Sequence, residues 1–530
     1  MPFNKITYQK SGYFSKLIED YLDEKSELKI LYNRFPKLEN YKQQIEEKSV
    51  NFNDNFKRQI LVADIERQYS KFEVSDATLN NIKLLNLNNT FTITTGHQLS
   101  LFTGPLYFLY KIISTINLCI QLKSEYKDYN FVPIYWMATE DHDFEEINHF
   151  NFKDKIIKWN KESLGPVGRI APPINENDLK IFLNELAETK NGQYLKELFE
   201  KSYFEHQNLA DATRFLVNEL FKNEGLVIID GDSIALKKMF TPYVKKELLE
   251  QASFKNVNES NKHLKEYFVQ VNPREINLFY IENNLRERIV FENGIYKINN
   301  TKLQFSETEI LNELEHHPEK FSPNVILRPL FQEVILPNLC YIGGGGELAY
   351  WLELKSNFEK NFVTFPMLLL RNSVLLVTEK QAKKAAKLGL NWSDLFSFQS
   401  DLLDKKVREF SKLRIDFSEQ KAHLKIQFEN LYIIANQTTS SFVGAVKAQE
   451  IKQIKGLENL EKRLLKAEKR NYDEKLERIV LLQNELFPNQ SLQERKLNFS
   501  EFYLNYGMEL LSKLMENLKP LDQEFTILVL

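Results

Sequence analysis

Near the front of the chain, two apolar runs with strand character each stop in a cluster of polar side chains. The first run, residues 91–95, leads into a loop that contains Gly96 and His97, and the second, residues 131–138, leads into a carboxylate-rich loop. The strands of an open α/β sheet deliver their binding loops at the carboxyl ends in this way. The two runs therefore predict an α/β sheet with its chemistry at one edge.

A helix is predicted between these two strands. Apolar residues recur along one face from Leu106 to Ile116, with Thr103 expected as the N-cap and Pro105 in the first turn. Lys111 is expected on the solvated face of this helix. Two such strands joined by one helix form a right-handed βαβ unit. Further strand character is expected at 225–230, 325–329, 339–342, 362–377 and 525–530.

The last third of the chain has a different pattern. From about residue 380 onward glycine and proline become scarce, and apolar residues step by three or four positions from Phe410 to Leu431 and again from Ile454 to Ile479. This spacing predicts an antiparallel coiled-coil hairpin. A plain helical subdomain packed on the core is the alternative, because Lys421 lies on the seam.

The core is expected to be discontinuous in sequence. We expect 1–150 to hold a helical lead-in and the first part of the core, 151–222 a first insertion, 223–240 a core strand, 241–322 a second insertion, 323–385 the last part of the core, 386–490 the coiled coil, and 491–530 a C-terminal segment that docks on the core.

Composition narrows the class of protein. A formal net charge of -3 gives no electrostatic footprint for nucleic acid. The two cysteines, Cys119 and Cys340, lie in apolar stretches, which predicts buried free thiols in a reducing cytoplasm. We expect no membrane span, because no uncharged apolar run reaches the ~18 residues that one needs, and the first residues lack the apolar stretch of a signal peptide.

Three polar clusters are candidate sites. In the first, Gly96 and Gly104 could offer backbone amides to a phosphate or carboxylate, with His97, Gln98 and Ser100 as further donors. A tight strand-to-helix turn without a ligand explains the same pattern.

The second cluster holds Asp141, His142 and Asp143, followed by Glu145 and Glu146. Carboxylates gathered at one strand end require a cation, which can be a metal ion, a substrate ammonium group, or an arginine or lysine. The spacing fits no standard zinc or calcium motif, so we expect no metal held by protein ligands alone, while Mg²⁺ bound together with a nucleotide stays open. His142 suits proton transfer. For the two glutamates, a negatively charged first helical turn is the alternative.

The third cluster is a run of four glycines, 343–346, followed by Glu347. Such a run at a strand end indicates close approach of the backbone to a ligand, whereas a flexible loop is the alternative. Tyr350 is expected on the same side of the following helix as Glu347, and Arg328 lies one predicted strand earlier.

Six segments together carry a family resemblance. They are TGHQLSLFTGPLYFLYK, VPIYWMATEDHDFEEINH, GLVIIDGD, RPLFQEVILP, YIGGGGELAYW and LFPNQSLQER. In this order and spacing the chain resembles the BshC family of bacillithiol biosynthesis. The resemblance implies a Rossmann-type core related to nucleotidyltransferases and class I aminoacyl-tRNA synthetases, two connecting-peptide insertions, and a coiled coil that forms a homodimer.

The resemblance also implies an activity. It is the last step of bacillithiol synthesis, in which a ligase joins the carboxyl group of cysteine to the amine of glucosaminyl malate. Activation of the carboxylate by ATP is expected. The loop at Gly96 departs from the nucleotide-binding signature of the synthetases, and Lys237-Lys238-Met239 matches only half of their second signature. Whether an adenylate or an acyl-phosphate forms therefore stays open.

The resemblance and the three clusters together give the candidate site residues. We expect catalytic roles for Asp141, His142 and Asp143. Binding of substrate or nucleotide is expected for Thr95, Gly96, His97, Gln98, Ser100, Thr103, Gly104, Trp136, Glu140, Arg328, Gln332, Gly345, Glu347, Tyr350 and Arg371.

Two other function classes stay open at this point. A metal-dependent hydrolase would use the cluster at Asp141, His142 and Asp143 with a bound metal and water. A scaffold protein would use the coiled coil as its working surface and leave the strand-end clusters dispensable.

Overall fold

The computed structural model describes residues 3–153, 155–161, 163–172, 177–186 and 188–530. The chain divides into two compact units. The core unit comprises the residues up to 375 together with 493–528, and the helical unit comprises residues 376–492.

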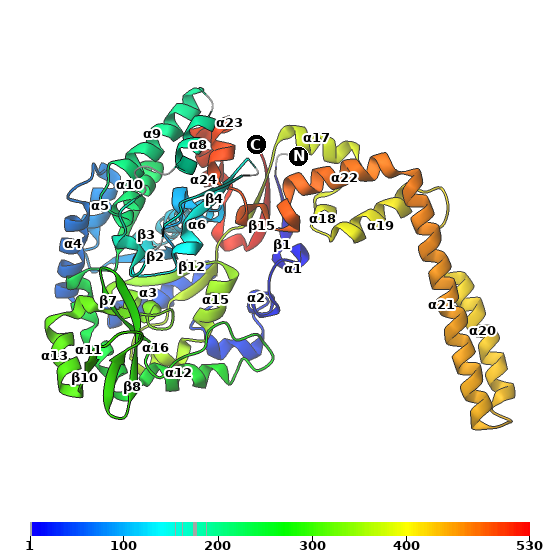
Figure 1. Ribbon diagram of the computed structural model, residues 1–530, viewed down its shortest axis with the longest axis horizontal. Helices are drawn as coiled ribbons and strands as arrows, with labels where there is room; N and C mark the ends of the chain where they lie inside the picture. The colour runs from blue at the N-terminus through cyan, green and yellow to red at the C-terminus, as the bar shows by residue number, and fades with distance from the viewer. Residues whose placement is uncertain (1–2, 154, 162, 173–176, 187) are drawn as a thin grey trace. The chain divides into compact units, whose positions relative to one another are not determined.

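A five-stranded parallel sheet lies at the centre of the core unit, in the order β13-β12-β2-β3-β6 (Figure 1). Its strands are nearly continuous in apolar residues and almost completely buried, as is typical of a sheet covered on both faces. This confirms the predicted α/β core. The strands are β2 (Thr90–His97), β3 (Asn130–Met137), β6 (Val227–Asp230), β12 (Asn338–Gly343) and β13 (Met367–Leu370).

The strand order places a topological switch point between β2 and β12. From β2 the chain proceeds to β3 and β6 on one side, whereas from β12 it proceeds to β13 on the other side. Connections that leave neighbouring strands in opposite directions open a crevice outside the carboxyl ends of those strands. In this fold the crevice lies between Gly96, at the end of β2, and the glycine run after β12.

Helices from distant parts of the chain cover the sheet. Tyr41 and Ile45 of α3 pack in one buried cluster with Leu118 and Leu122 of α6 and with side chains of β2, β12 and β13. The helices of this region are α1 (Tyr8–Ser11), α2 (Lys16–Leu22), α3 (Tyr41–Asn51), α4 (Asn55–Tyr69), α5 (Asp76–Leu84), α6 (Tyr107–Glu125), α15 (Gly345–Leu352) and α16 (Lys355–Lys360).

Two segments interrupt the sheet. Between β3 and β6 lie α7 (Phe144–Ile147), β4 (His149–Phe152), β5 (Lys155–Lys158), α8 (Asn177–Glu185), α9 (Lys190–Phe204) and α10 (Leu209–Phe221). Between β6 and β12 lie α11 (Ile234–Glu250), α12 (Ala252–Asn261), β7 (Leu278–Glu282), β8 (Leu285–Glu292), β9 (Ile295–Ile298), β10 (Gln304–Phe305), α13 (Glu307–His316), β11 (Phe321–Pro323) and α14 (Arg328–Ile335). The strands of the second segment form a separate sheet in the order β10-β9-β8-β7-β11.

One expected strand in this region is wrong. Residues 325–329 are not extended, because Arg328 begins α14 and Pro329 occupies its first turn. Proline is favoured at that position, since its missing N–H has no partner in the helix. The apolar run before it therefore packs as a turn.

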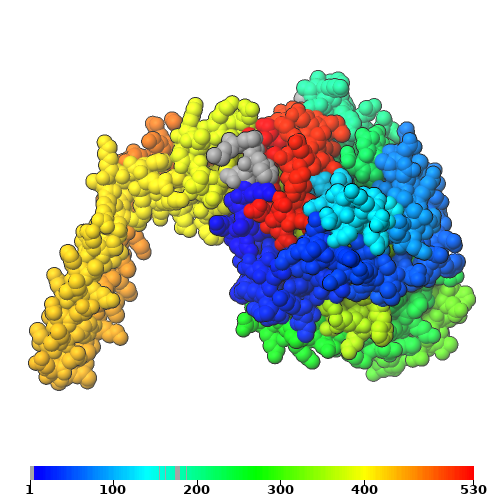
Figure 2. Space-filling model, turned by 180° about the vertical axis from the view of Figure 1, so that it is seen from behind, coloured from blue at the N-terminus to red at the C-terminus, as the bar shows by residue number. Residues whose placement is uncertain are grey.

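The two ends of the core unit meet. β1 (Phe3–Thr7) pairs antiparallel with β15 (Glu524–Val529), which is the predicted terminal strand. Figure 2 shows the N-terminal segment in blue and the C-terminal segment in red side by side on one face. The C-terminal segment also contains α23 (Phe499–Tyr506) and α24 (Met508–Asn517), and β14 (Val374–Val377) leads into the helical unit.

The helical unit contains the predicted coiled-coil hairpin. α20 and α21 lie side by side (Figure 1), and Phe428, Ala435 and Val446 form their buried seam. The seam lysine, Lys421, pairs with Glu461 of the opposite helix at 2.8 Å. The arms are shorter than the predicted stripe, because Phe410 and Ile479 lie in α19 and α22. The helices are α17 (Glu379–Lys387), α18 (Trp392–Leu395), α19 (Gln399–Phe410), α20 (Ser418–Ala435), α21 (Ser440–Asn471) and α22 (Asp473–Leu486).

Two further expectations concern the cysteines and membrane-spanning helices. Cys119 and Cys340 are both buried and free, and burial raises the pKa of the Cys340 thiol to about 12. Among the residues that the structure describes, no helix has the length and apolar character to cross a membrane.

Candidate active site

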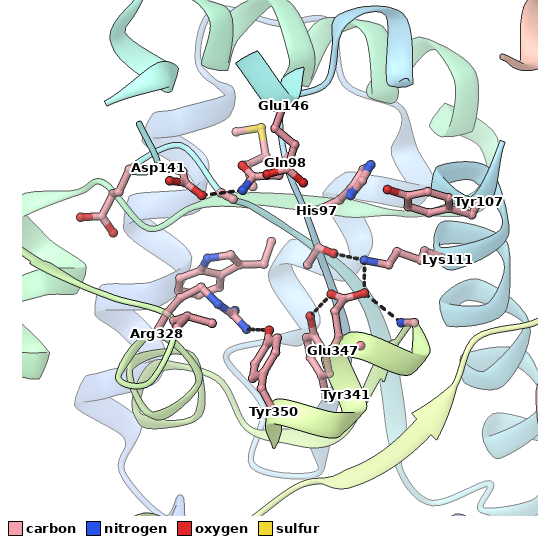
Figure 3. A pocket seen from close by; sticks show the side chains of 18 of the residues that line it. His97, Gln98, Tyr107, Lys111, Asp141, Glu146, Arg328, Tyr341, Glu347 and Tyr350 are labelled. Atoms are coloured by element: carbon pink, nitrogen blue, oxygen red, sulfur yellow. Dashed lines mark hydrogen bonds and ion pairs between the residues drawn. The ribbon is translucent and has the colours of Figure 1, made fainter. Parts of the chain in front are cut away.

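A cavity of about 620 Å³ opens at the carboxyl ends of β2, β3 and β12, within the core unit (Figure 3). Its position coincides with the switch point of the sheet. It is lined by the predicted residues Gly96, His97, Gln98, Trp136, Glu140, Asp141, Arg328, Gly345, Glu347, Tyr350 and Arg371. The predicted residues Thr95, Ser100, Thr103, Gly104, His142, Asp143 and Gln332 are not among its lining residues.

Lys111 links the two sides of the switch point, and the expectation that it lies on a solvated face is wrong. Its side chain is 3% exposed, its ammonium group donates to the backbone carbonyl of Gly96 at 2.7 Å, and it lies 2.5 Å from the Glu347 carboxylate. Glu347 also accepts from the Tyr341 hydroxyl and from the Gly344 amide, both at 2.8 Å (Figure 3). Although burial acts to raise the pKa of Glu347, Lys111, the Gly344 amide and the Tyr341 hydroxyl together keep it below its usual range.

Arg328 is held at the edge of the cavity from two sides. Its guanidinium donates to Gln332 at 3.1 Å and to the Tyr350 hydroxyl at 3.3 Å. Gln332 in turn donates to the buried carboxylate of Glu333 at 2.9 Å. Gln332 therefore positions Arg328 from behind and does not itself line the cavity.

Asp141 is the best-anchored carboxylate of the second cluster. It accepts from the Gln98 side chain, from the backbone N–H of His142 at 2.7 Å, and from Arg286 at 3.5 Å. Although burial acts to raise the pKa of Asp141, the side chain of His142, whose Nδ1 lies 3.4 Å away, together with Arg286 and Gln98, holds it well below its usual range. Asp141 is therefore an ionised carboxylate at neutral pH.

His142 lies beside the cavity, with a half-exposed side chain. Arg286 of β8 donates to His142 Nδ1 at 2.7 Å and stacks 4.0 Å from the centroid of the Phe279 ring. Nδ1 also lies 3.4 Å from the Asp141 carboxylate, but Arg286 is the nearer group. Since an arginine can only donate, Nδ1 of the neutral ring accepts from Arg286, and the proton of the neutral ring then lies on Nε2. In this arrangement His142 offers a donor to a ligand.

Asp143 has a structural role at the start of α7. Its carboxylate caps the short helix by accepting from the Glu146 amide at 3.3 Å, and it is exposed. Glu146, one turn later, lines the cavity. Burial raises the pKa of Glu146, and Asp141, Asp143 and Glu347 add to this effect. Glu146, which lines the cavity, is therefore the carboxylate of this cluster that we consider as a proton acceptor.

His97 is a neutral ring in the wall of the cavity. Burial, followed by the charges of Lys111 and Arg371, keeps the pKa of His97 well below its usual range. Its Nε2 is buried and has no hydrogen-bond partner among the described residues, and its ring packs 4.9 Å from that of Phe108. His97 can thus offer one nitrogen to a ligand without carrying charge.

The loop between β2 and α6 is a tight turn, and Thr103 is not the N-cap of α6. Leu106 occupies that position, and Thr103 has a left-handed φ of 67°. Gly104 also has a positive φ, and a Cβ there would lie 2.7 Å from the Ser100 Cβ, so the turn requires glycine. Asn498 donates to the carbonyl of Gly104 at 2.6 Å. Thr103, Gly104 and Ser100 therefore shape the loop.

Glu140 is the link to the end of β6. It pairs with the buried Lys237 at 2.6 Å, and Lys237 also contacts Asp232 at 3.1 Å. Asp232 accepts two hydrogen bonds from Arg169, at 2.7 and 2.9 Å. The half-signature around Lys237 that we noted in the sequence thus serves an ion-pair network beside the cavity.

The cavity combines both signs of charge. Its cations are Lys111, Arg286, Arg328, Arg371 and Arg495, and its carboxylates are Glu140, Asp141, Glu146 and Glu347. Such a lining suits a zwitterion together with a polyanion. Among the described residues, no group of three or more His, Cys, Asp or Glu side chains is arranged to hold a metal ion.

Sequence reasoning missed Lys111, Arg286, Tyr107, Tyr341, Glu146 and Arg495 as lining residues. Five of them carried a usable signal. Glu146 belongs to the carboxylate cluster, and the others lie in the segments that carry the family resemblance, namely Tyr107, Lys111, Tyr341 and Arg495. Arg286 carried none, because its place in the cavity depends on the path of the β7–β8 hairpin.

Comparison with known proteins places the chain in a family. Residues 1–372 match the family described as "Bacillithiol biosynthesis BshC, N-terminal Rossmann-like domain", and residues 374–530 match "Bacillithiol biosynthesis BshC, C-terminal coiled-coil domain". A solved structure titled as a putative arginyl-tRNA synthetase from Campylobacter jejuni aligns with 79% of this chain and with 99% of that chain. The identity is 10% and the TM-score is 0.19.

Relatives resemble the chain over its full length. A Flavobacterium psychrophilum protein named "Putative cysteine ligase BshC" is 64% identical over 528 residues, which are 100% of this chain and 99% of that protein. A Flavobacterium johnsoniae protein of the same name is 63% identical over 530 residues, covering 100% of both. A Bacillus cereus protein of that name is 27% identical over 98% of each chain. The chain therefore belongs to the BshC family of bacillithiol biosynthesis.

Proposed function

We propose that this protein is a ligase that forms an amide bond between the carboxyl group of L-cysteine and the amine of glucosaminyl malate, giving bacillithiol. The observation that carries the proposal is the cavity of mixed charge at the switch point of the sheet. It lies in a chain whose full-length relatives carry the name "Putative cysteine ligase BshC". An amino acid and a sugar bearing two carboxylates match this distribution of charge.

The carboxylates and the cations of the cavity take different parts of the substrates. Asp141 is ionised and rigidly held, so it binds an ammonium group. Glu146, whose pKa is raised, accepts the proton that frees the sugar amine for attack. His142 donates from Nε2 to a substrate oxygen while Arg286 occupies its Nδ1. The arginines bind carboxylate or phosphate groups.

Amide formation from a free carboxylate requires activation, since a carboxylate is a poor electrophile. ATP is the proposed co-substrate, through an acyl-adenylate or an acyl-phosphate. Because the described carboxylates are not arranged as a metal cage, Mg²⁺ would arrive with the phosphates and take one or two protein carboxylates at most. Glu140, Asp141 and Glu146 are the candidates in the lining.

We also propose that the protein works in the cytoplasm as a homodimer formed through the α20–α21 hairpin. The hairpin carries large apolar side chains that its own seam leaves exposed, such as Ile426 (56% exposed), Ile433 (62%) and Ile434 (58%). An unpaired apolar surface of this kind marks an interface. Sedimentation equilibrium of the purified chain measures the mass directly, and a monomer at micromolar concentration would contradict the dimer.

The activity is tested by incubating the purified protein with glucosaminyl malate, cysteine, ATP and Mg²⁺, followed by mass spectrometry. We expect bacillithiol together with AMP or ADP, which identifies an adenylate or an acyl-phosphate respectively. Glu146→Gln is expected to lose most of the activity, whereas the matched control Glu282→Gln, half-exposed on β7 and absent from the cavity lining, should not. Folded protein that forms no bacillithiol with all four components present would contradict the proposal.

A further inference from the structure

We propose that Arg371 and Arg495 form a subsite of the cavity that binds the two carboxylates of a small dicarboxylate group, the malyl part of the amine substrate. This inference rests on the proposed function and deepens it, because it assigns one end of the cavity to one portion of one substrate. It also gives a role to the Glu494-Arg495 pair of the C-terminal segment, which the roles assigned above leave without a function.

Arg371 offers one free donor to the cavity. Its side chain is 5% exposed, and its terminal nitrogens donate to the Asn372 carbonyl at 2.9 Å, to Ser373 at 3.2 Å and to Glu494 at 2.8 Å. Its Nε is buried without a partner among the described residues. Such a buried, unsatisfied donor is costly unless a ligand meets it.

The glycine run lies next to this donor. A Cβ added to Gly344 would lie 3.8 Å from Arg371 Nε, so a side chain at Gly344 would stand beside that buried N–H and narrow the approach to it. Gly344 and Arg371 line the same cavity. A ligand oxygen can therefore reach Nε next to the start of α15.

Glu494 is a positioning residue for Arg371. Its side chain is 1% exposed, and it accepts from Arg371 at 2.8 Å, from the Ser373 hydroxyl at 3.1 Å and from the Val374 amide at 3.0 Å. These contacts fix the guanidinium in one orientation. Because Glu494 is fully occupied by them, it leaves the Nε of Arg371 for a ligand.

Arg495 supplies the second cation. It follows Glu494 directly, is exposed, lines the cavity, and forms no hydrogen bond or ion pair with any residue that the structure describes. Its guanidinium is therefore free to bind a carboxylate through two parallel hydrogen bonds. Because the neighbouring Glu494 is held by its hydrogen bonds, the backbone from which the Arg495 side chain extends is fixed.

Both arginines belong to the end of the cavity at Tyr107. The Arg371 guanidinium lies 5.0 Å from the centroid of the Tyr107 ring. Burial raises the pKa of Tyr107 to about 12, while the charges of Arg371 and Arg495 act in the opposite direction. Figure 3 shows Tyr107 beside Lys111, on the opposite side of the cavity from Asp141 and Arg328. The subsite is thus separate from the Asp141 end.

The chemistry at this end fits two carboxylates. The Nε–H of Arg371 and the guanidinium of Arg495 are two separate donor groups, one for each carboxylate of a malyl group. Because Glu494 already offsets the charge of Arg371, this end of the cavity carries too little positive charge for a triphosphate. The Gly344 amide is already bonded to Glu347 at 2.8 Å, so that amide is not available to a phosphate. We therefore assign nucleotide phosphates to another part of the cavity.

The test compares Arg495→Gln with the matched control Arg478→Gln, an arginine that is 64% exposed in the helical unit and does not line the cavity. Calorimetry measures the Kd of L-malate and of glucosaminyl malate without turnover, and kinetics give the KM of each substrate. For Arg495→Gln we expect both Kd values and the KM for glucosaminyl malate to rise at least tenfold, while kcat and the KM for cysteine change less than twofold. Glu494→Gln should raise the same KM while sparing kcat.

The outcomes separate this inference from the proposed function. Loss of malate binding in Arg495→Gln, in a protein that forms no bacillithiol, supports the subsite and contradicts the ligase. Bacillithiol formation with unchanged Kd and KM values in Arg495→Gln overturns the subsite and keeps the ligase. If Arg495→Gln weakens binding of ATP or inorganic phosphate and spares malate, the subsite binds phosphate and the inference is wrong. It is also wrong if the unaltered protein binds neither L-malate nor glucosaminyl malate at millimolar concentration.

Discussion

The ammonium group of Lys111 lies 2.5 Å from the carboxylate of Glu347, across the point where the parallel sheet changes direction. Lys111 belongs to the helix that follows β2, and Glu347 belongs to the helix that follows β12. The pair therefore ties together the two loops that open the cavity. Because Lys111 also holds the carbonyl of Gly96, it fixes the end of β2 as well.

Replacing Lys111 by methionine should destabilise the core unit by about 2 kcal/mol, because it leaves the Glu347 carboxylate partly buried without its cation. Glu347→Gln should cost less, since the amide oxygen still accepts from Tyr341 or Gly344. Urea denaturation at pH 7 measures both. Equal stability of Lys111→Met and the unaltered protein would show that the pair contributes nothing.

The pH dependence of this effect has a definite sign. The pKa of Glu347 in the folded protein lies below the usual 4.5, so the contribution of its charge is complete above pH 4.5 and is lost as the pH falls through the folded value. The difference between Lys111→Met and the unaltered protein should therefore shrink in acid. A difference that stays constant from pH 7 to pH 3.5 would contradict this assignment.

A second buried pair supports the sheet from behind the cavity. Lys48 lies 3.1 Å from Glu333, and both side chains are almost fully buried. Lys48→Met should lower the free energy of unfolding by about 3 to 5 kcal/mol, because it leaves a buried carboxylate without its cation. Lys48→Met combined with Glu333→Leu should lower the free energy of unfolding by less than the single change. The exposed pair Lys297–Glu292 is the control, and Lys297→Met should cost about 0 to 1 kcal/mol. Equal effects of Lys48→Met and Lys297→Met on urea denaturation would contradict the argument.

Asp230, at the end of β6, should make the protein less stable as the pH rises from about 4 to 7. Burial and the neighbouring Asp232 raise its pKa to about 6, so between 3.8 and 6 the folded state binds more protons than the unfolded state. Asp230→Asn keeps an oxygen to accept from Thr139 and from the Asp232 amide. It should be more stable than the unaltered protein at pH 7.5, by about 1 to 3 kcal/mol, and should lose that advantage at pH 4.

Asp232→Asn is the control for that measurement, and its effect should have the opposite sign. Lys237 and Arg169 hold the pKa of Asp232 below its usual range despite burial, so removing its charge leaves Arg169 without its carboxylate and Lys237 with Glu140 alone. It should destabilise the protein at pH 7.5. If both substitutions changed stability in the same direction, the assignment of charge to this pair would be wrong.

The sequence predicted the parts of the fold that depend on local pattern. The central strands are apolar throughout because both faces are covered, and this alone marks 91–95 and 131–138. The predicted coiled-coil stripe was too long, because α19 and α22 show the same spacing of apolar residues as the hairpin. The strand expected at 325–329 was wrong. The apolar residues of this short run show no periodicity that would distinguish a strand from a turn before a helix.

The site was predicted mainly where polar residues directly follow strands. Asp141, Glu347 and Gly96 fit that rule. The rule did not find Lys111, because a lysine in a helix is usually solvated. Here its burial depends on Glu347, which lies far along the chain. The rule did not find Arg495 for a similar reason, since only the docking of the C-terminal segment brings this residue to the cavity.

Single replacements of Asp141 and of Asp143 by asparagine should distinguish a residue of the site from a residue that only caps a helix. Asp141→Asn removes the charge that Gln98 and Arg286 surround, and we expect bacillithiol formation to fall about 100-fold or more. Asp143→Asn should retain activity within about threefold, because asparagine caps a helix as well as aspartate does. The two variants differ by one charge at positions two residues apart, so each controls for the other. Near-normal turnover of folded Asp141→Asn would remove Asp141 from the reaction, and a collapse of activity in Asp143→Asn would restore the catalytic role that the sequence predicted for it.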